Sequence, residues 1–254
     1  MPFLAAIRFL TSIPLPWRQE DWRQRASREQ FARSLPYYPV VGLLIGLMLA
    51  GIYWLCSLFL PQALTSGILL VALVAITGGL HLDGFIDSVD GIAAGHKNAD
   101  RRKRVMHDSS VGAIGVVAVV LLLLVKYAAL NSVPSSWLMA TLVLMPVLSR
   151  WAMVYAVFAY PYGRQQGMGG ELRRATGWSG FTAATVVALA IALVLAQLAG
   201  LAILLVVWLV VIALAAFFKS KFAGLTGDTY GAINELAEVS VLIVVALMAY
   251  NGWL

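Results

Sequence analysis

The sequence predicts an all-α membrane protein, a polytopic bundle of about seven transmembrane helices with one further short helix at the N-terminus. Of its 254 residues, 61% are hydrophobic and only 12% are charged, and the mean hydropathy is +0.86. Soluble domains carry roughly a quarter charged residues and about 45–50% apolar ones. An excess of this size predicts lipid-facing surface. No internal repeat divides the chain, so we expect residues 1–254 to form a single integral membrane domain.

The N-terminal residues 1–16 are mostly apolar, but Arg8 interrupts them and two prolines close them. A helix needs roughly 20 residues to cross a hydrocarbon core of about 30 Å. The segment also lacks the basic, apolar and small-residue order of a signal peptide. We therefore expect an interfacial or re-entrant helix packed against the bundle.

Seven apolar runs follow this segment and predict the transmembrane spans. They cover residues 39–60, 63–80, 111–133, 137–159, 181–198, 201–218 and 239–254. The second run and the last three are short or are joined by tight turns. The pattern therefore leaves six or eight spans open.

All lysines and arginines except Lys126 and Arg150 lie in the N-terminal segment or in every second loop. The positive-inside rule then places the N-terminus and the large loops in the cytoplasm. This distribution over short loops between apolar runs argues against a nucleic-acid partner, despite a net charge of +6. We expect Lys126 to reach the outer interface as a structural residue. Arg150 lies deeper, and it could either anchor a phosphate or pair with a carboxylate.

The acidic residues are expected on the same cytoplasmic face, and none is expected inside a span. Transporters usually place carboxylates or broken helices near the midplane of the bilayer. The pattern therefore favours chemistry at the cytoplasmic mouth over transport. The single cysteine, Cys56, excludes a disulfide within the chain.

The first candidate site motif covers residues 78–91 at the end of the second span. Its three aspartates, Asp83, Asp87 and Asp90, are spaced by four and three residues. On a helix of 3.6 residues per turn, they lie within about 60° of one another. Carboxylates on one face are tolerated when a hard cation lies among them, which favours Mg²⁺, Mn²⁺ or Ca²⁺. The alternative is a solvated helix end, and His81 is as consistent with a structural role as with a catalytic one.

A second motif, residues 106–115, leads into the third span. Asp108 and Ser109 are residue types that cap helix N-termini. The same helix N-terminus could instead bind phosphate while Asp108 reaches the metal. The sequence leaves these two roles open.

The third motif covers residues 224–238 and contains three glycines together with Asp228 and Glu235. The two acids share a helix face if the segment is continuous. Glycine allows close approach of the backbone to a ligand, which makes Thr226 and Gly227 candidate substrate-binding residues. A plain connecting loop is the alternative.

These three motifs, in this order, resemble the cobalamin synthase family, the adenosylcobinamide-GDP ribazoletransferases. The resemblance runs over the whole chain. It also includes residues 9–16, the segment 37–42 and the segment 225–232. The family's turn carries a basic residue before the Asp-Ser pair, whereas this chain has His107 there.

The resemblance implies that the protein joins GDP-activated adenosylcobinamide to α-ribazole, or to its 5′-phosphate, and releases GMP. It also implies a Mg²⁺ requirement and a place in a bacterial inner membrane, with a cytoplasmic active site. It leaves open whether the protein is a homo-oligomer. The residues then expected in the site are His81, Asp108 and Glu235 as catalytic groups, Asp83, Asp87, Asp90 and Asp228 as metal ligands, and Ser109, Arg150, Gly227 and Thr226 as substrate-binding groups.

The main alternative is a lipid enzyme similar to the CDP-alcohol phosphotransferases. The segment from Asp87 through Asp90, Gly91 and Ala94 resembles the opening of their signature. However, Gly95 stands where that signature has arginine, and the later glycine and aspartate pair is absent at the required spacing. A transporter is the weaker alternative.

Overall fold

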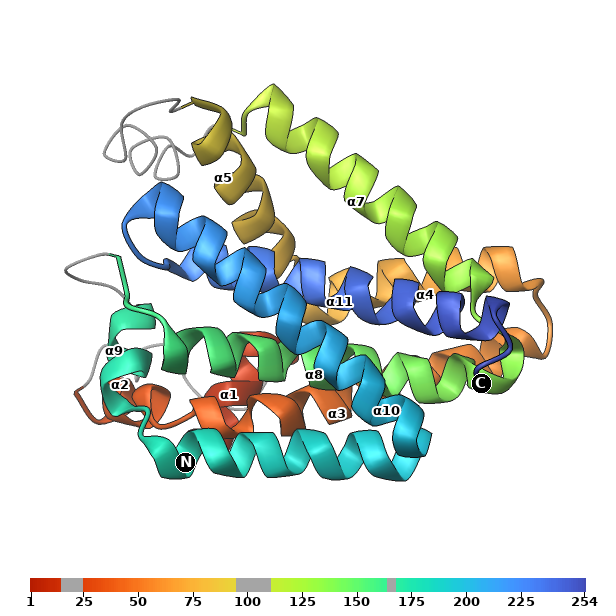
Figure 1. Cartoon of the computed structure of the whole chain (residues 1–254), viewed down its shortest axis with the longest axis horizontal. Helices are drawn as coiled ribbons and strands as arrows, with labels where there is room; N and C mark the ends of the chain where they lie inside the picture. The colour runs from red at the N-terminus through yellow and green to blue at the C-terminus, as the bar shows by residue number, and fades with distance from the viewer. Residues whose placement is uncertain (15–24, 95–110, 164–167) are drawn as a thin grey trace.

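The computed structural model describes residues 1–14, 25–94, 111–163 and 168–254, and the regular structure in these ranges is helical apart from one bridge between Tyr162 and Leu225. The helices are α1 (Pro2–Leu10), α2 (Arg25–Ala32), the 3₁₀ turn η2 (Leu35–Tyr37), α3 (Tyr38–Ser57), α4 (Gln62–Thr77), α5 (Leu80–Ala94), α7 (Ala113–Ser132), α8 (Ser135–Ala159), α9 (Met168–Ala175), α10 (Trp178–Phe222) and α11 (Gly227–Tyr250). Figure 1 shows most of the long helices running between the same two ends of the molecule. The predicted all-α bundle is confirmed.

Five of the described helices are long and apolar enough to cross a membrane: α3, α7, α8, α10 and α11. The bent pair formed by α4 and α5 raises the number to six if it counts as one span. Helix α10 has 45 residues, which at about 1.5 Å per residue would extend about 68 Å, twice the thickness of a hydrocarbon core. With the α4–α5 pair counted as one span and the two arms of α10 counted separately, the described residues contain seven candidate spans, in line with the prediction of about seven.

The chain reverses direction inside α10 at Gln197, whose backbone leaves the helical region with φ 48° and ψ −129°. Figure 1 shows the two arms of α10 running back from this point. Gly200 makes the reversal compact, because a side-chain carbon there would lie 2.7 Å from the carbonyl carbon of Ala192. The predicted turn at residues 199–200 is therefore displaced by two to three residues, to Gln197.

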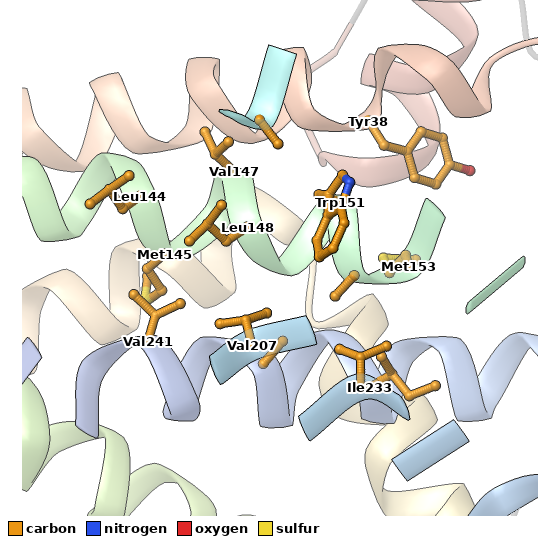
Figure 2. Packing of buried hydrophobic residues seen from close by; sticks show 14 of the residues in the cluster. Tyr38, Leu144, Met145, Val147, Leu148, Trp151, Met153, Val207, Ile233 and Val241 are labelled. Carbon is orange, nitrogen blue, oxygen red and sulfur yellow. The ribbon is translucent and has the colours of Figure 1, made fainter. Parts of the chain in front are cut away.

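Helix α8 lies at the centre of the bundle and is the most deeply buried of the candidate spans. Figure 2 shows its side chains Val147, Leu148 and Trp151 packed among residues from neighbouring helices. On α3, Gly42 and Gly46 face α8 so closely that added side-chain carbons would lie 2.8 Å and 2.6 Å from backbone Cα atoms of α8. Small residues four apart permit this kind of close helix packing in membranes.

The second predicted span, residues 63–80, corresponds to α4 and ends in a sharp bend. Gly78 and Gly79 both adopt left-handed backbone angles, with φ 64° and 71°, and α4 and α5 meet there at 90°. The N-terminal segment covers the break, because the Ser12 amide and hydroxyl donate to the carbonyls of Ile76 and Ala75, at 2.7 Å and 2.5 Å. The short helix α1 thus packs against the bundle, and the aspartates lie on a separate helix instead of at the end of the second span.

The last span differs most from the prediction. It was expected to begin at residue 239, but α11 begins at Gly227 and continues without interruption to Tyr250. Glu235 and Glu238 therefore lie inside a candidate span and not in a cytoplasmic loop. Both are buried, with exposures of 5% and 1%, which corrects the expectation that no acid lies inside a span.

The orientation of the bundle can be tested by labelling single cysteines in a Cys56→Ser background. Figure 1 places the start of α8 and the end of α10 at opposite ends of the bundle, and Ser135 and Ser220 are exposed there. Because lysine and arginine mark the cytoplasmic side, we expect Ser220→Cys to react from the cytoplasm and Ser135→Cys from outside. Labelling of both positions from the same side would contradict the predicted topology.

Candidate active site

Helices α5 and α11 meet at two glycines, and this contact brings two of the predicted motifs together. A side-chain carbon at Gly84 would lie 2.8 Å from the carbonyl oxygen of Asp228 and 3.0 Å from its Cα. One turn further along α11, a side-chain carbon at Gly231 would lie 3.1 Å from the carbonyl oxygen of His81. Only residues without side chains permit backbones to approach this closely. The Thr-Gly-Asp segment is therefore next to the helix that carries the aspartates.

The aspartates around this contact differ in exposure. Asp83 is exposed, while Asp87 and Asp228 are half-buried. Asp83 is adjacent in sequence to Gly84. Asp87 lies about one turn after Asp83, on the same face of α5. Oxygen-rich, partly hydrated groups of this kind are what Mg²⁺ uses when one or two carboxylates hold it and phosphate or water completes its coordination.

The described residues contain no preformed metal cage, because no three His, Cys, Asp or Glu side chains among them converge closely enough to hold an ion. Asp87 and Asp228 nevertheless fit the mode in which Mg²⁺ arrives with a substrate phosphate and takes few protein ligands. The donor set is therefore consistent with the predicted metal, with most of its coordination supplied by substrate and water.

Asp90 is engaged in a structural contact. Its Oδ2 accepts from the Gly112 amide at 2.8 Å, and its Oδ1 accepts from the Gly115 amide at 2.7 Å. Those amides belong to the first turn of α7, where backbone N–H groups have no partner within the helix and favour a negative charge. Asp90 thus caps α7 from α5, a role that its predicted assignment as a metal ligand did not anticipate.

Thr226 is fully buried and caps α11. Its hydroxyl accepts from the Thr229 amide at 3.3 Å, while the Thr229 hydroxyl accepts from the Thr226 amide at 2.7 Å. This reciprocal arrangement is a capping box. Gly227 is exposed, and a side chain there would meet nothing within 4 Å. Of these two candidate substrate-binding residues, only Gly227 therefore lies on an accessible surface.

The loop after α8 packs beside this cap. The Gly163 amide donates to the Leu225 carbonyl at 2.7 Å, and the Leu225 amide donates to the Pro161 carbonyl at 2.9 Å. The rings of Tyr162 and Tyr230 stack with centroids 6.5 Å apart. These contacts hold the start of α11 against the loop that follows α8.

His81 is buried, with an exposure of 2%, and neither ring nitrogen has a hydrogen-bond partner among the described residues. Arg150, Glu238 and Lys126 are the charged groups that act on its ring electrostatically. A hydrogen-bonded structural histidine, the alternative left open above, is therefore not what the described residues contain. An unsatisfied imidazole beside a site is a place for water or ligand.

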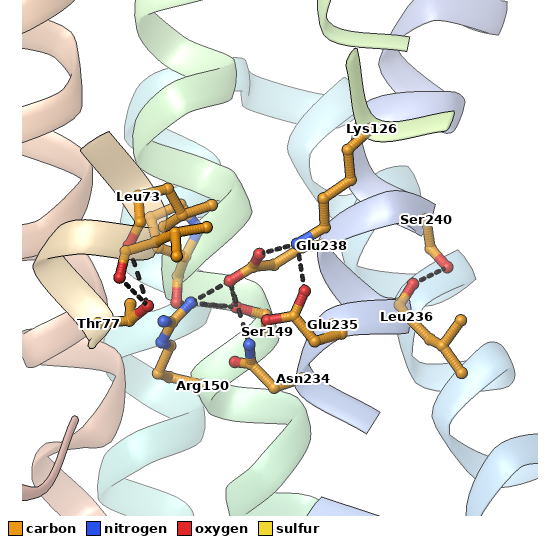
Figure 3. Close-up of polar contacts among 12 residues, drawn as sticks. Leu73, Thr77, Lys126, Ser149, Arg150, Asn234, Glu235, Leu236, Glu238 and Ser240 are labelled. Carbon is orange, nitrogen blue, oxygen red and sulfur yellow. Dashed lines mark hydrogen bonds and ion pairs between the residues drawn. The ribbon is translucent and has the colours of Figure 1, made fainter. Parts of the chain in front are cut away.

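Glu235 takes part in an ion-pair cluster that we define as Lys126, Arg150, Glu235 and Glu238 (Figure 3). Lys126 Nζ lies 2.6 Å from a Glu235 oxygen and 2.5 Å from a Glu238 oxygen. The other Glu238 oxygen pairs with Arg150 Nη1 and accepts from Asn234 Nδ2 at 3.1 Å. All four side chains are buried, and their formal charges cancel.

This cluster corrects the expectation for Lys126, which does not reach the outer interface but lies buried, with an exposure of 1%, between α7 and α11. For Arg150, the structure contains the carboxylate pairing that the sequence left open beside phosphate anchoring. Glu235 points to Lys126 and is two turns from Asp228 along α11. Asp108 and Ser109 lie outside the described residues.

Sequence reasoning missed Glu238, Gly84 and the role of Lys126. A usable signal existed for the cluster, because a lysine inside an apolar run needs a partner of opposite charge at similar depth. Residues 235 and 238 are that partner once the last span is extended towards its N-terminus. No signal marked Gly84, since close approach depends on which helices become neighbours.

A family model described as cobalamin-5-phosphate synthase matches residues 2–246. A protein of Roseiflexus sp. is 36% identical over 248 residues, covering 98% of this chain and 90% of its own length. A protein of Desulforamulus reducens is 37% identical over 95% of this chain and 94% of its own, and one of Pseudomonas putida is 40% identical over 97% and 99%. All three are named adenosylcobinamide-GDP ribazoletransferase. No solved structure matches the chain.

Proposed function

Because the chain belongs to the cobalamin-5-phosphate synthase family, we propose that it is an adenosylcobinamide-GDP ribazoletransferase that works in the membrane. Its substrates are adenosylcobinamide-GDP and α-ribazole or the 5′-phosphate of α-ribazole, and GMP leaves. We place the enzyme in a bacterial inner membrane, with its N-terminus and active site towards the cytoplasm. The observation that supports this site most directly is the contact between Gly84 on α5 and Asp228 on α11.

In this reaction a free ribose hydroxyl of the acceptor attacks the phosphorus atom that stays with the cobinamide. A new P–O bond forms, the P–O–P bridge to the guanosine phosphate breaks, and GMP departs with the bridging oxygen. The attacking hydroxyl loses its proton. Catalysis of phosphoryl transfer consists mainly of positioning and of stabilising negative charge. A site built on two helix ends held together by glycines supplies rigid positioning.

We assign Asp87 and Asp228 as the residues that would hold Mg²⁺, with exposed Asp83 next to them on α5. When bound, the ion neutralises charge on the attacking and leaving oxygens. Gly227, at the exposed first turn of α11, presents backbone N–H groups that suit a phosphate oxygen. Asp108 and Ser109, outside the described residues, remain candidates for the same phosphates.

Two alternatives are less well supported. The sequence argument against a transporter was that no acid lies inside a span. That argument no longer holds, because Glu235 and Glu238 lie inside one. Membership of the family argues against it instead, since the matched relatives carry the name of a transferase. The same relationship disfavours a CDP-alcohol phosphotransferase-like enzyme, whose signature this chain completes only in part.

The test is GMP release by the purified protein in detergent or liposomes. We expect GMP and a corrinoid product in equal amounts when adenosylcobinamide-GDP is supplied with α-ribazole or its 5′-phosphate. Chelation by EDTA should stop the reaction and added Mg²⁺ should restore it, because the metal offsets charge in the transition state. CDP-activated lipid serves as the control and should yield no CMP. Absence of GMP with both acceptors would contradict the proposal.

A further inference from the structure

We propose that Lys126, through Glu235 and Glu238, is a positioning residue that sets how α11 presents Asp228 to α5. This proposal rests on the proposed function for its catalytic readout. The three residues belong to the ion-pair cluster, and in this role they act through Asp228 and not by contact with substrate.

The cluster occupies the same face of α11 as the active-site contact. Gly231, Glu235 and Glu238 are spaced by four and three residues, so they lie along one stripe of the helix. Gly231 abuts His81 on α5, while the two glutamates pair with Lys126 on α7. A rotation of α11 by one residue would separate both glutamates from Lys126. The ion pairs therefore fix the rotation of α11 that brings Asp228 to Gly84.

Lys126 also shares a face of its own helix with the contact to α5. Gly115 and Lys126 are eleven residues apart, which is close to three full turns. Gly115 donates to Asp90 of α5, and Lys126 pairs with α11. Helices α5, α7 and α11 are thus joined pairwise: α5 to α7 by Asp90, α5 to α11 by the glycines, and α7 to α11 by Lys126. Loss of one of these contacts is expected to loosen the packing of all three helices.

A small void confirms that the cluster adjoins the bend before α5. Its lining includes Leu73 and Thr77 from the end of α4, Leu82 from the start of α5, and the charged groups Lys126, Glu235 and Glu238. In Figure 3, the end of α4 lies beside the cluster. The cluster therefore lies beside the start of the helix that carries the aspartates.

Stability alone does not account for four charges in this place. A buried ion pair often stabilises a protein no more than apolar residues of the same volume would. Charged residues inside transmembrane helices are costly and are usually functional. What ion pairs add over apolar contacts is a specific register, because charges tolerate only one arrangement of partners.

The experiment compares the wild-type full-length enzyme with a double variant that carries both Lys126→Met and Glu235→Gln. Together these changes keep the cluster neutral and leave the Arg150–Glu238 pair intact. We expect a melting temperature close to that of the wild type, an unchanged KM, and a kcat lower by about 10- to 100-fold, since a misplacement of about 1 Å can cost that much. The single variant Lys126→Arg keeps the charge and should retain most of the wild-type turnover. Val125→Met, on the lipid-facing side of α7, is the matched control and should behave as wild type.

A distance measurement makes the test independent of activity. Spin labels at Leu80 on α5 and Leu247 on α11, both exposed, are placed in a Cys56→Ser background. We expect a narrow distance distribution in the parent and a shifted or broader one in the double variant. Wild-type kcat in the double variant, an unchanged distribution, or a parallel fall of melting temperature and kcat that Lys126→Arg does not rescue would each overturn the proposal. Failure of the wild type to release GMP would instead contradict the proposed function, while the distances would still report on α11.

Discussion

Replacing Asp87 by asparagine is expected to lower turnover by about 100-fold or more, while the protein inserts and purifies normally. Asp87 is half-buried on the face of α5 next to the Gly84–Asp228 contact. Asparagine keeps the size of the side chain but removes the negative charge that we propose for metal binding. Metal stabilisation of the transition state is worth several kcal/mol, and each 1.4 kcal/mol or so is tenfold in rate. The measurement is the rate of GMP release at saturating substrate and Mg²⁺.

Asp90→Asn is the matched control, because it removes the same charge from the same helix one turn away. Asp90 accepts from the Gly112 and Gly115 amides of α7, so its loss should mainly affect stability, by about 1–2 kcal/mol for a charge at a helix N-terminus. Turnover should fall less than in Asp87→Asn. Near-normal activity of Asp87→Asn would reduce the aspartate motif to a solvated helix face, and equal losses in both variants would return Asp90 to the metal site.

Replacing Arg150 by methionine is expected to destabilise the protein by about 3–5 kcal/mol, the cost of removing one partner of a buried ion pair. Arg150 is fully buried and pairs with Glu238 through Nη1. Without it, two buried carboxylates share the single positive charge of Lys126. The change should appear as a lower melting temperature of the detergent-solubilised protein.

Adding Glu238→Gln to Arg150→Met should recover most of the lost stability, because the Lys126–Glu235 pair then remains and the cluster is again neutral. The same variant separates the two roles that the sequence left open for Arg150. A phosphate anchor would be lost in both variants, and KM for adenosylcobinamide-GDP would rise even where stability is recovered. An unchanged KM in the stable double variant identifies Arg150 as a partner of Glu238 alone. No recovery of stability would contradict the ion-pair account.

Much of the fold follows from the sequence, because apolar runs of about 20 residues have few alternatives in a bilayer. The spans at α3, α7 and α8 agree with the predicted runs to within three residues at each end. Two of the three predicted site motifs lie in contact across Gly84 and Gly231. Hydropathy and local spacing carried these predictions, since both depend only on neighbours in the chain.

The start of the last span was wrong because the prediction treated Glu235 and Glu238 as residues that must lie in water. Their burial depends on Lys126 and Arg150, which are 109 and 88 residues away from their respective glutamates in the chain. The break between α4 and α5 was missed for a related reason. Two adjacent glycines permit a left-handed turn, but the hydrogen bonds that Ser12 donates to the end of α4 come from a segment more than sixty residues away in the chain.

Apolar runs and residue spacing alone predict a membrane helix bundle with clustered aspartates, because lipid demands apolar spans and internally satisfied backbones. The surroundings of each acid depend on how the helices pack. Asp90 is used in capping α7, Glu235 and Glu238 in neutralising buried cations, and Asp87 and Asp228 lie half-exposed beside the glycine contact. A carboxylate's role follows from the donors and charges around it, and those come from helices that only folding brings together.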